Sequence, residues 1–434
     1  MGADPLVTWP GQREGCVARD GMNVLIIGSG GREHALADAL SRSPELGRLL
    51  AAPGNPGIAQ LATCFPGADT PGRWLELARD QAVDLTVVGP EAPLALGVVD
   101  LFREAGLAIL GPDRSASRLE SSKRFAKGCM ERWGIPTARY AAFSEFGEAL
   151  RALPDFGFPV VIKDSALAGG KGVTIAADPS QASSALERIL SRAGAEVVVE
   201  EFLQGTELSL LALMDGQSAF TFPICQDHKA QREGDQGPMT GGMGVICPLP
   251  VSQELRGRLD REILEPTLQG LHGGGLAYRG VLYCGVLVTE QGPKLLEYNV
   301  RFGDPEAEAL LPLLGGGLLS LLRAAASGRL PAGPLDVQGA SAALILAAGG
   351  YPQAAQLGAK IEIGDLASGV RLFHCATARR GEQLVVAGGR VLALQASAAD
   401  LPSALASVYA AAERVRFDGM QFRRDIGLHA AALR

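Results

Sequence analysis

The segment FPVVIKDSALAGGKGVTIAA, residues 158–177, sets two apolar runs on either side of a glycine-rich turn that carries a lysine. Apolar runs separated in this way predict two strands joined by a flexible loop. Lys163 ends the first run, and Lys171 lies within Gly-Gly-Lys-Gly. Such a hairpin can close over a polyphosphate, because glycines let backbone N–H groups approach and lysines neutralise charge. The sequence is not a Walker A loop, and a surface hairpin with solvated lysines is the alternative.

The residues before this hairpin alternate short apolar runs with segments of helical periodicity. The apolar runs are residues 23–27, 49–52, 84–88 and 107–110. This alternation predicts a parallel α/β sheet, in which ligands bind beyond the carboxyl ends of the strands. The chain carries GSGG (28–31), PGNPG (53–57) and GPEAPL (89–94) at those ends.

The first of these turns, GSGGRE, differs from a dinucleotide fingerprint at its sixth position, Glu33. The second strand also lacks the acidic residue that binds a ribose, since it ends in Ala51-Ala52-Pro53-Gly54. Binding of NAD is therefore disfavoured. The glycines still suit a phosphate, because they expose backbone N–H groups at the start of a helix. A tight turn that binds nothing is the alternative.

The residues after the hairpin predict a second strand pair, EVVVEEFL (196–203) with ELSLLALMD (207–215), followed by a long polar loop over 226–244. A helix over about 251–272 and two more strands, within 281–290 and 294–304, complete this part. A third unit begins after the PAGP linker at 331–334. The fold class is therefore α/β, with about three units.

The segment LLEYNVRFGDPE, residues 295–306, carries the strongest local signal. Side chains alternate along a strand, so Glu297, Asn299 and Arg301 are expected on one face. Oxygen atoms of Glu297 and Asn299 suit Mg²⁺, which leaves its other positions to phosphates and water. Arg301 beside them can hold an anionic reactant. A structural ladder of ion pairs is the alternative.

Two further segments combine polar residues with free backbone. Glu200 and Glu201 end a run of valines, where a strand-to-loop hinge can read the edge of an adenine. A solvated strand end is the other interpretation. The loop over 226–244 holds Asp227, His228 and Lys229, and a loop of that length is more often functional or disordered than a mere connector.

The composition excludes several classes of protein. The 434 residues are 47% hydrophobic with a net charge of −7, which disfavours a surface that coats nucleic acid. No uninterrupted apolar run reaches the length of a membrane span. Seven scattered cysteines without a CxxC pair favour reduced cytosolic thiols over disulfides or a zinc site. Residues 1–21 lack the features of a signal peptide, so we expect the fold to begin at Met22, with a disordered extension or a mis-assigned start before it.

Nine short motifs follow one another in an order that resembles the phosphoribosylamine–glycine ligase family. They are GSGGREHAL, APGNPG, GPEAPL, LESSK, GGKG, VEEFL, QDHK, GPMTGGMG and EYNVRFGDPE, and the similarity spans about Met22 to Asp425. The family comprises ATP-grasp ligases of de novo purine synthesis. The resemblance implies an N-terminal parallel α/β (pre-ATP-grasp) domain that binds substrate, an ATP-grasp domain with a glycine-rich lid, and a small C-terminal mixed α/β domain. The expected bounds are 22–122 for the first, 123–195 for the lid, 196–330 for the catalytic subdomain and 335–434 for the last.

The same resemblance implies that glycine attacks the γ-phosphate of ATP and that 5-phosphoribosylamine then displaces phosphate from glycyl phosphate. Catalysis of this kind is mainly positioning and electrostatic stabilisation, so no side-chain nucleophile is required. It further implies Mg²⁺ or Mn²⁺ at Glu297 and Asn299, and a cytoplasmic, monomeric enzyme without nucleic-acid or membrane partners.

The implied site residues fall into three further groups. The residues expected to bind ATP are Lys123, Lys163, Gly170, Lys171, Gly172, Glu200, Glu201, Phe202, Leu203 and Glu207. The residues expected to bind the other substrates are Gly28, Gly30, Gly31, Arg32, Asn55, Gly89, Pro90, Glu91, Asp227, Lys229, Arg301 and Asp304. The residues expected to act in catalysis are Arg301, Asp227 and Lys171.

The chain departs from the family pattern at several positions. Asp164, Ser165 and Ala166 replace Ala, Asp and Gly in the lid, which shifts a carboxylate by one residue and turns it to the opposite face. Ala230, Met239 and Glu308 replace Arg, Asn and Gln, and HCAT replaces HAGT. Two alternatives stay open: another ATP-grasp carboxylate–amine ligase, or a non-catalytic nucleotide-binding descendant.

Overall fold

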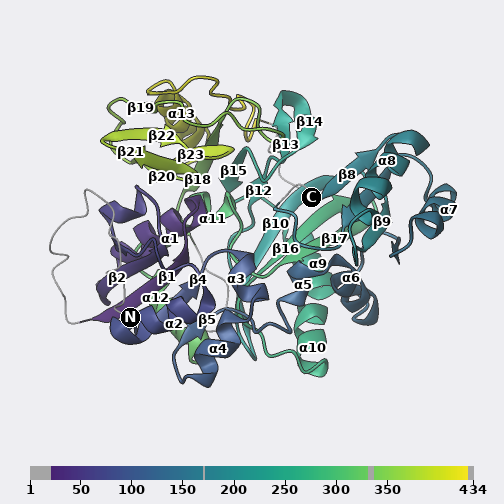
Figure 1. Cartoon of the computed structure of the whole chain (residues 1–434), viewed down its shortest axis with the longest axis horizontal. Coiled ribbons are helices and arrows are strands. Elements are labelled where there is room, and N and C mark those ends of the chain that lie inside the picture. Colours follow the sequence, from purple (N-terminus) through teal and green to yellow (C-terminus); the bar gives the residue numbers. More distant parts are fainter. Residues whose placement is uncertain (1–20, 170–171, 331–336, 429–434) are drawn as a thin grey trace.

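The computed structural model describes residues 21–169, 172–330 and 337–428 (Figure 1). The expected extension lies outside the described residues, except for Gly21. Gly170 and Lys171, at the tip of the expected lid, also lie outside them.

A five-stranded parallel sheet forms near the N-terminus, in the order β3-β2-β1-β4-β5. Its strands are β1 (Met22–Gly28), β2 (Leu46–Pro53), β3 (Thr63–Cys64), β4 (Leu85–Val88) and β5 (Ile109–Leu110). The four apolar runs expected as strands are confirmed, and only the two-residue β3 was not expected. Its helices are α1 (Gly31–Ser41), α2 (Pro71–Asp80), α3 (Glu91–Ala95) and α4 (Val98–Glu104), with a 3₁₀ turn, Ile58–Gln60.

Both faces of this sheet are covered, because alternate residues of β1 enter different cores. Val24 and Ile26 pack in the core that holds α1, whereas Leu25 and Ile27 pack with residues of α2 and α4. Period-two alternation assigns one set to each face. A strand buried on both faces reads as a continuous apolar run, as NVLII does.

A four-stranded antiparallel sheet forms the lid, in the order β6-β9-β7-β8. Its strands are β6 (Tyr140–Phe143), β7 (Val160–Asp164), β8 (Val173–Ala176) and β9 (Val197–Glu201). The expected hairpin β7–β8 is confirmed. The expected pairing of residues 196–203 with 207–215 is wrong, because β9 pairs with β6 and β7 of the lid instead.

Helices α7 (Phe146–Phe156) and α8 (Pro179–Leu190) cover one face of the lid sheet. Asp178 caps α8 by accepting a hydrogen bond from the Gln181 N–H at 2.9 Å, and proline follows at the first helical position. Val160 and Ile162 point into the core beneath these helices. The intervening Val161 and Lys163 therefore face the opposite side of the sheet.

A central antiparallel sheet, in the order β11-β10-β16-β17, lies beside the lid (Figure 1). Its strands are β10 (Thr206–Asp215), β11 (Ala219–Thr221), β16 (Arg279–Thr289) and β17 (Gly292–Asn299). The helix expected over about 251–272 is confirmed as α9 (Gln253–Leu259) and α10 (Glu265–Gly273), joined by a π-helical turn. The other helices of this part are α5 (Arg118–Ser121), α6 (Lys123–Arg132), α11 (Glu306–Leu310) and α12 (Leu318–Ala326), with a 3₁₀ turn, Leu311–Leu314.

A five-stranded antiparallel sheet near the C-terminus joins residues from two parts of the chain, in the order β12-β15-β18-β23-β20. Its strands are β12 (Gln226–Asp227), β15 (Gly244–Cys247), β18 (Ala340–Ala347), β20 (Val370–His374) and β23 (Arg390–Ala398), and α13 (Leu401–Ala412) packs on it. The expected loop over 226–244 is thus partly wrong, because it begins and ends in strands of this sheet.

Three small antiparallel pairs complete the structure: β13 (Ala230–Arg232) with β14 (Gln236–Met239), β19 (Glu362–Ile363) with β24 (Val415–Arg416), and β21 (Thr377–Arg380) with β22 (Gln383–Val386). The described elements confirm the expected fold class: a parallel α/β part, a lid with a central sheet, and a mixed α/β part at the C-terminus.

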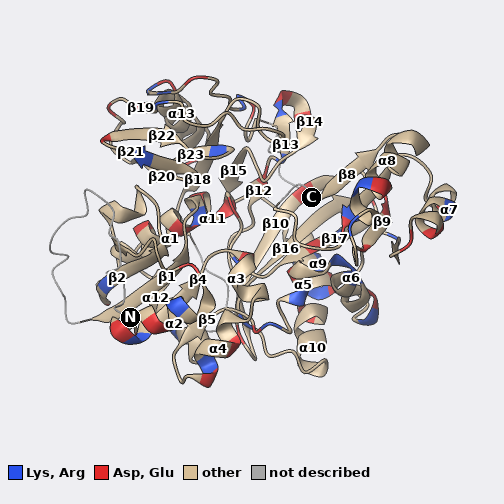
Figure 2. Ribbon diagram, viewed as in Figure 1, with Lys and Arg blue, Asp and Glu red and all other residues tan. Residues whose placement is uncertain are grey.

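Both signs of charge are interspersed along peripheral helices such as α4 and α8 (Figure 2). Among the described residues, no single helix has the length and apolarity needed to cross a membrane. One pair, Glu306–Leu314 with Leu318–Ala326, meets those criteria only when the two are counted together, and it is bent by 104°.

Candidate active site

A cavity of about 500 Å³ lies between the lid sheet, the central sheet and the loops of the N-terminal sheet. Most of the site residues predicted from the sequence line this cavity. They are Arg32, Pro90, Glu91, Lys123, Lys163, Gly172, Glu200, Glu201, Phe202, Leu203, Glu207, Asp227, Lys229, Glu297, Asn299, Arg301 and Asp304. The lining residues that were not predicted include Glu120, Lys127, Tyr283 and Arg390.

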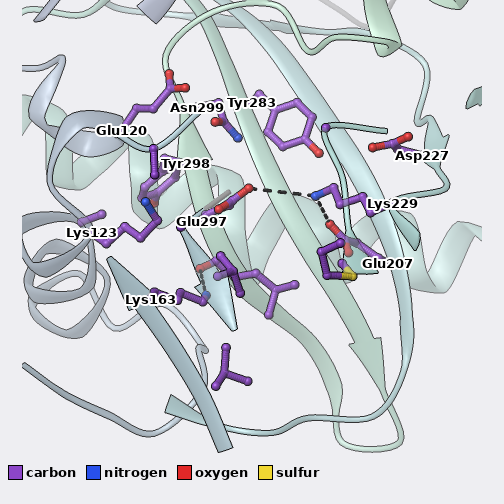
Figure 3. Close-up of a pocket in the computed structure, with 18 of the residues that line it drawn as sticks. Glu120, Lys123, Lys163, Glu207, Asp227, Lys229, Tyr283, Glu297, Tyr298 and Asn299 are labelled. Atoms are coloured by element: carbon purple, nitrogen blue, oxygen red, sulfur yellow. Dashed lines mark hydrogen bonds and ion pairs between the residues drawn. The ribbon is translucent and has the colours of Figure 1, made fainter. Parts of the chain in front are cut away.

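Glu297 lies at the centre of a group of lysines (Figure 3). Lys229 pairs with Glu207 and lies with its Nζ 4.0 Å from Glu297 Oε1, while Lys123 and Lys163 approach from the other side. Burial alone would raise the pKa of Glu297, but these three ammonium groups outweigh it and lower the pKa to about 2. Glu297 is therefore ionised at neutral pH.

The donor set around Glu297 fits a divalent cation that brings its own phosphate ligands. Asn299 lies two residues further along the same face of β17, and its Oδ1 accepts one hydrogen bond, from Arg301 at 3.2 Å. An amide oxygen has two lone pairs, so one remains available. No group of three or more His, Cys, Asp or Glu side chains within the described ranges could hold a metal. A cation here would thus depend on phosphate and water for its other positions.

Arg301 lies just beyond the end of β17, although the sequence placed it on the strand. Its guanidinium donates to Glu120 at 2.8 Å and forms an ion pair with Glu91 at 3.3 Å. Glu120 also accepts the N–H of Val300 at 2.7 Å, so it holds both the side chain and the backbone at this point. These contacts explain why Arg301 still reaches Asn299. Burial opposes the charge, but the two carboxylates raise the pKa of Arg301 above its usual value.

A second buried cluster joins Lys127, Glu200 and Lys163 at the lid side of the cavity. The Glu200 carboxylate lies 3.1 Å from Lys127 Nζ and 3.0 Å from Lys163 Nζ, and it is 2% exposed. The interpretation of Glu200 as a solvated strand end is therefore wrong. Burial lowers the pKa of Lys127 to about 8, although Glu200 opposes that shift. Lys127 lies four residues after Lys123 on α6, so the two lysines share one face of the helix. This spacing could have predicted Lys127 as a site residue.

Replacing Glu200 by glutamine is expected to lower the free energy of unfolding by about 3 kcal/mol at pH 6, because two buried ammonium groups lose their shared partner. The loss should shrink by pH 9. The variant lowers the folded-state pKa of Lys127 further below its unfolded value, so the unfolded state binds more protons and stability rises with pH. Urea unfolding at both pH values measures this.

Glu201→Gln is the matched control, because this neighbouring carboxylate is 34% exposed, lies 3.8 Å from the Arg139 guanidinium and accepts the Arg139 N–H at 2.8 Å. We expect a change within about 1 kcal/mol and no trend with pH. Equal effects of the two substitutions would contradict the buried cluster.

Glu33 occupies the turn that was expected to present free N–H groups. Its Oε2 accepts the N–H of Ser29 at 3.2 Å and of Gly30 at 2.6 Å, so the expectation of free groups does not hold for these two residues. A Cβ on Gly89 would lie 2.1 Å from Glu33 Oε1, and one on Gly28 would lie 2.5 Å from Glu33 Cγ. These glycines make room for a buried carboxylate. The sixth position of GSGGRE departs from a dinucleotide fingerprint because its side chain, that of Glu33, fills this space.

Gly89→Ala is expected to lower the free energy of unfolding by about 1–3 kcal/mol, because Glu33 must move and release N–H groups that it now satisfies. Gly72→Ala is the control, since a Cβ there meets nothing within 4 Å. Gly72 lies in α2, where alanine is the better helix former, so that variant should be neutral or slightly stabilised. Chemical denaturation compares the two, and an equally harmless Gly89→Ala would argue against the packing of Glu33.

Five nominated residues do not line the cavity: Gly28, Gly30, Gly31, Asn55 and Gly89. Asn55 is 3% exposed and directs its amide to the backbone of Ser29 and His374, each at 2.8 Å. It thereby ties the N-terminal part to the C-terminal sheet. Contact of these five residues with a substrate stays a prediction, as does the role of Lys171.

Asp227 and Asp304 lie at the far end of the cavity from the lid. Burial and the nearby Glu306 raise the pKa of Asp227 well above its usual range. Asp304 lies 3.1 Å from the guanidinium of Arg390, a residue of β23. Sequence reasoning missed Arg390, because only the fold brings a residue of the C-terminal sheet to this wall.

The altered lid residues are part of the base of the hairpin. Asp164 points away from Lys163 and pairs with Arg192, as alternation predicts. Its second oxygen accepts the N–H of Ala166 at 3.1 Å, and Ser165 Oγ accepts the N–H of Arg124 at 3.2 Å. The substituted residues therefore connect the end of β7 to α6 and to the segment that follows α8. Their effect on ATP stays untested.

Models of one family match almost the whole described chain. They are the N domain of phosphoribosylglycinamide synthetase over residues 22–120, its ATP-grasp (A) domain over 121–307 and its C domain over 341–429. The chain is 44% identical to the phosphoribosylamine–glycine ligase of Chlorobaculum tepidum, a match that covers 94% of this chain and all of that protein. It is also 44% identical to the enzyme of Mesorhizobium japonicum, over 95% of this chain and 99% of the relative.

Solved structures agree with these matches. The crystal structure of phosphoribosylamine–glycine ligase from Thermotoga maritima superposes with a TM-score of 0.83 at 33% identity, over 93% of this chain and all of that one. The biotin carboxylase domain of a Hydrogenobacter thermophilus carboxylase has a TM-score of 0.70 at 19% identity, over 93% of this chain and 92% of that one, and shares the fold. The chain therefore belongs to the phosphoribosylglycinamide synthetase family of ATP-dependent ligases.

Proposed function

We propose that the chain ligates glycine to 5-phosphoribosylamine. An oxygen of the glycine carboxylate attacks the γ-phosphorus of ATP and ADP leaves, which gives glycyl phosphate. The amine nitrogen then attacks the acyl carbon, loses a proton and displaces inorganic phosphate, so that glycinamide ribonucleotide forms. The observation that carries this proposal is the convergence of three lysines and Arg301 on one cavity around the ionised Glu297. Transfer of a phosphoryl group to a carboxylate requires such positioning and charge neutralisation.

The lid side of the cavity is proposed to bind ATP. Lys123, Lys163 and Lys171 would neutralise the triphosphate, and Gly170 and Gly172 would let the backbone approach it. Phe202 and Leu203, which follow β9 and line the cavity, would hold the adenine together with Glu200 and Glu201. Glu207 would bind the ribose. The Glu200 carboxylate already pairs with Lys127 and Lys163, so the role of this carboxylate would be to hold Lys163 in place.

The opposite side is proposed to bind the reacting groups. Arg301 would orient the acyl phosphate, since its guanidinium is held by Glu120 and Glu91 and cannot turn freely. Arg32, Pro90, Asp227, Lys229 and Asp304 would face the amine substrate. Asp227 would receive the amine proton, because its carboxylate lines the cavity on that side and its raised pKa makes the carboxylate a stronger proton acceptor.

Glu297 and Asn299 would hold Mg²⁺, or Mn²⁺ in its place, together with phosphate oxygens. The bound ion would supply charge neutralisation between phosphates. We also infer domain bounds of 22–122, 123–195, 196–330 and 335–434, close to the family-model ranges. A cytoplasmic monomer remains our prediction, supported by the free, mostly buried cysteines of the described chain.

Measurement of ADP release with freshly generated phosphoribosylamine tests the proposal. ADP should form only when glycine and phosphoribosylamine are both present. Release with a different carboxylate would favour another ATP-grasp ligase, and binding of ATP without turnover would favour a non-catalytic descendant. Growth of a purine auxotroph that lacks this ligase, restored by the chain, would exclude the non-catalytic alternative.

A further inference from the structure

A carboxyl group in α11, that of Glu308, is buried without a hydrogen-bond donor among the described residues. The side chain is 0% exposed, and neither oxygen has a partner. An ionised carboxylate in such a position loses its hydration and gains no hydrogen bond in exchange, which strongly disfavours the charged form.

The groups that face Glu308 from neighbouring elements do not supply a donor. From α1, Gly31 packs so closely that a Cβ on it would lie 2.3 Å from Glu308 Oε1 and 2.6 Å from the Cys375 sulfur. Arg32, the next residue of α1, directs its guanidinium to Glu33 and to the carbonyl of Phe302. Cys375, which follows β20, is half-buried and carries a neutral thiol, because desolvation raises its pKa well above its usual range.

Two charged residues complete these surroundings. Arg390 of β23 donates to the carbonyls of Gly241 and Asp304 and pairs with the Asp304 carboxylate. Asp304 lies four residues before Glu308, just outside the start of α11. Two consecutive glycines pack against the two carboxyl groups, since a Cβ on Gly30 would lie 3.6 Å from Asp304 Oδ2 and one on Gly31 would lie 2.3 Å from Glu308 Oε1. The two carboxyl groups are therefore neighbours, and each shifts the pKa of the other.

We propose that Glu308 is a carboxylic acid at neutral pH and donates its proton in a hydrogen bond to Asp304, whose carboxylate it thereby orients toward Arg390 and the cavity. Glu308 would act as a positioning residue, because Asp304 lines the cavity and Glu308 does not.

The electrostatics of the pair assign the proton to Glu308. Burial and the charge of Asp304 raise the pKa of Glu308 well above its usual range. Burial also acts on Asp304, but Arg390, Arg32 and the hydrogen bond from Glu308 hold its pKa below its usual value. Two adjacent buried carboxyl groups share one proton for this reason. Asp304 therefore carries the charge that its arginines balance.

This inference rests on the proposed function in one respect, the assignment of Asp304 to the amine substrate. A neutral Glu308 leaves Arg32 balanced by Glu33 and Arg390 balanced by Asp304, so these four groups carry no net charge at that end of the cavity. Ionisation of Glu308 would add an unbalanced negative charge there and would weaken the binding of an anionic substrate such as a sugar phosphate.

Infrared difference spectroscopy tests the protonation directly. At pH 7 the wild-type chain, compared with Glu308→Gln, should show the carbonyl stretching band of a protonated carboxylic acid that the variant lacks. Glu265→Gln, at the start of α10, is the control and should leave that band in place. A wild-type chain without the band would overturn the proposal.

Unfolding of the wild type and of Glu308→Gln, measured from pH 6 to pH 9, tests the same point without substrate. The folded-state pKa of Glu308 is raised, so the folded wild type holds a proton that the unfolded chain has released, and its stability falls as pH rises. Its unfolding constant should rise relative to the variant by up to tenfold per pH unit. A difference that does not change with pH would overturn the proposal.

Kinetics tests the positioning role. Glu308→Leu should raise the KM for phosphoribosylamine at least tenfold and leave the KM for ATP within about twofold, whereas Glu308→Gln, which can still donate to Asp304, should restore it. Equal effects on both substrates would overturn the role. If the wild type performs no ligation, the proposed function fails, while the infrared and unfolding results still decide the state of Glu308.

Discussion

Glu297→Gln is expected to reduce glycine-dependent ADP formation by about 10³-fold or more. The substitution keeps the size of the side chain and removes the single carboxylate that the lysines Lys123, Lys163 and Lys229 surround. Loss of a charge aimed at a phosphoryl-transfer site costs about 10²–10³ in kcat, and here the proposed metal ligand is lost as well. A coupled assay of ADP release, run across a range of Mg²⁺ concentrations, measures the effect.

Binding of ATP without metal separates this loss from general damage to the cavity. The variant carries the same three lysines and one negative charge fewer, so metal-free ATP should bind at least as tightly as to the wild type in calorimetry. Glu290→Gln, in the exposed turn between β16 and β17, is the control and should behave as the wild type. Full turnover of Glu297→Gln would remove the metal assignment.

Arg301→Met should lower both kcat and stability. Removal of the guanidinium leaves Glu120, 7% exposed, and Glu91 without their shared partner, so we expect about 3 kcal/mol less free energy of unfolding at pH 7. Loss of the group that orients the acyl phosphate should lower kcat by about 10²–10³. Arg301→Lys keeps the charge but loses the planar fork, and should recover more of the stability than of the kcat.

The stability loss of Arg301→Met should depend on pH. Burial already raises the pKa of Glu120, and without Arg301 it rises further. The folded variant then binds a proton that the unfolded chain lacks, so its stability falls as pH rises and part of the loss disappears near pH 5. Arg124→Met is the control, because its pair with Glu196 is more than half exposed on the arginine side and should be worth about 1 kcal/mol or less. A loss of equal size in both variants would contradict the buried pairs.

Local patterns predicted the central residues of the cavity well. Period-two alternation along residues 295–299 correctly placed Glu297 and Asn299 on one face, because a strand repeats every two residues whatever it pairs with. The same alternation correctly predicted that the shifted carboxylate, Asp164, turns to the other face of the strand, where it pairs with Arg192. These predictions needed only the existence of the strands.

Predictions that depended on the choice of partner strand were less successful. The sequence cannot tell that β9 pairs with β6 and β7 and not with β10, and that choice buries Glu200 between two lysines. Strand pairing is a non-local property, set by which faces the tertiary fold buries. Glu33 was missed for a different reason, since a motif comparison registers its departure from glycine without showing what the carboxylate does.

The C-terminal sheet determines when the cavity can be completed during synthesis of the chain. Strand β12, which carries Asp227, pairs with β15, and β15 pairs in turn with β18. The other neighbour of β18 is β23, the strand that carries Arg390. The ribosome releases β12 and β15 long before β18 and β23. Until then, the edge of β15 that later pairs with β18 has no partner strand. The lid and its lysines can fold in that interval. The amine end of the cavity is therefore the last to form, and a chain that terminates before Arg390 would retain the nucleotide side next to an incomplete sheet.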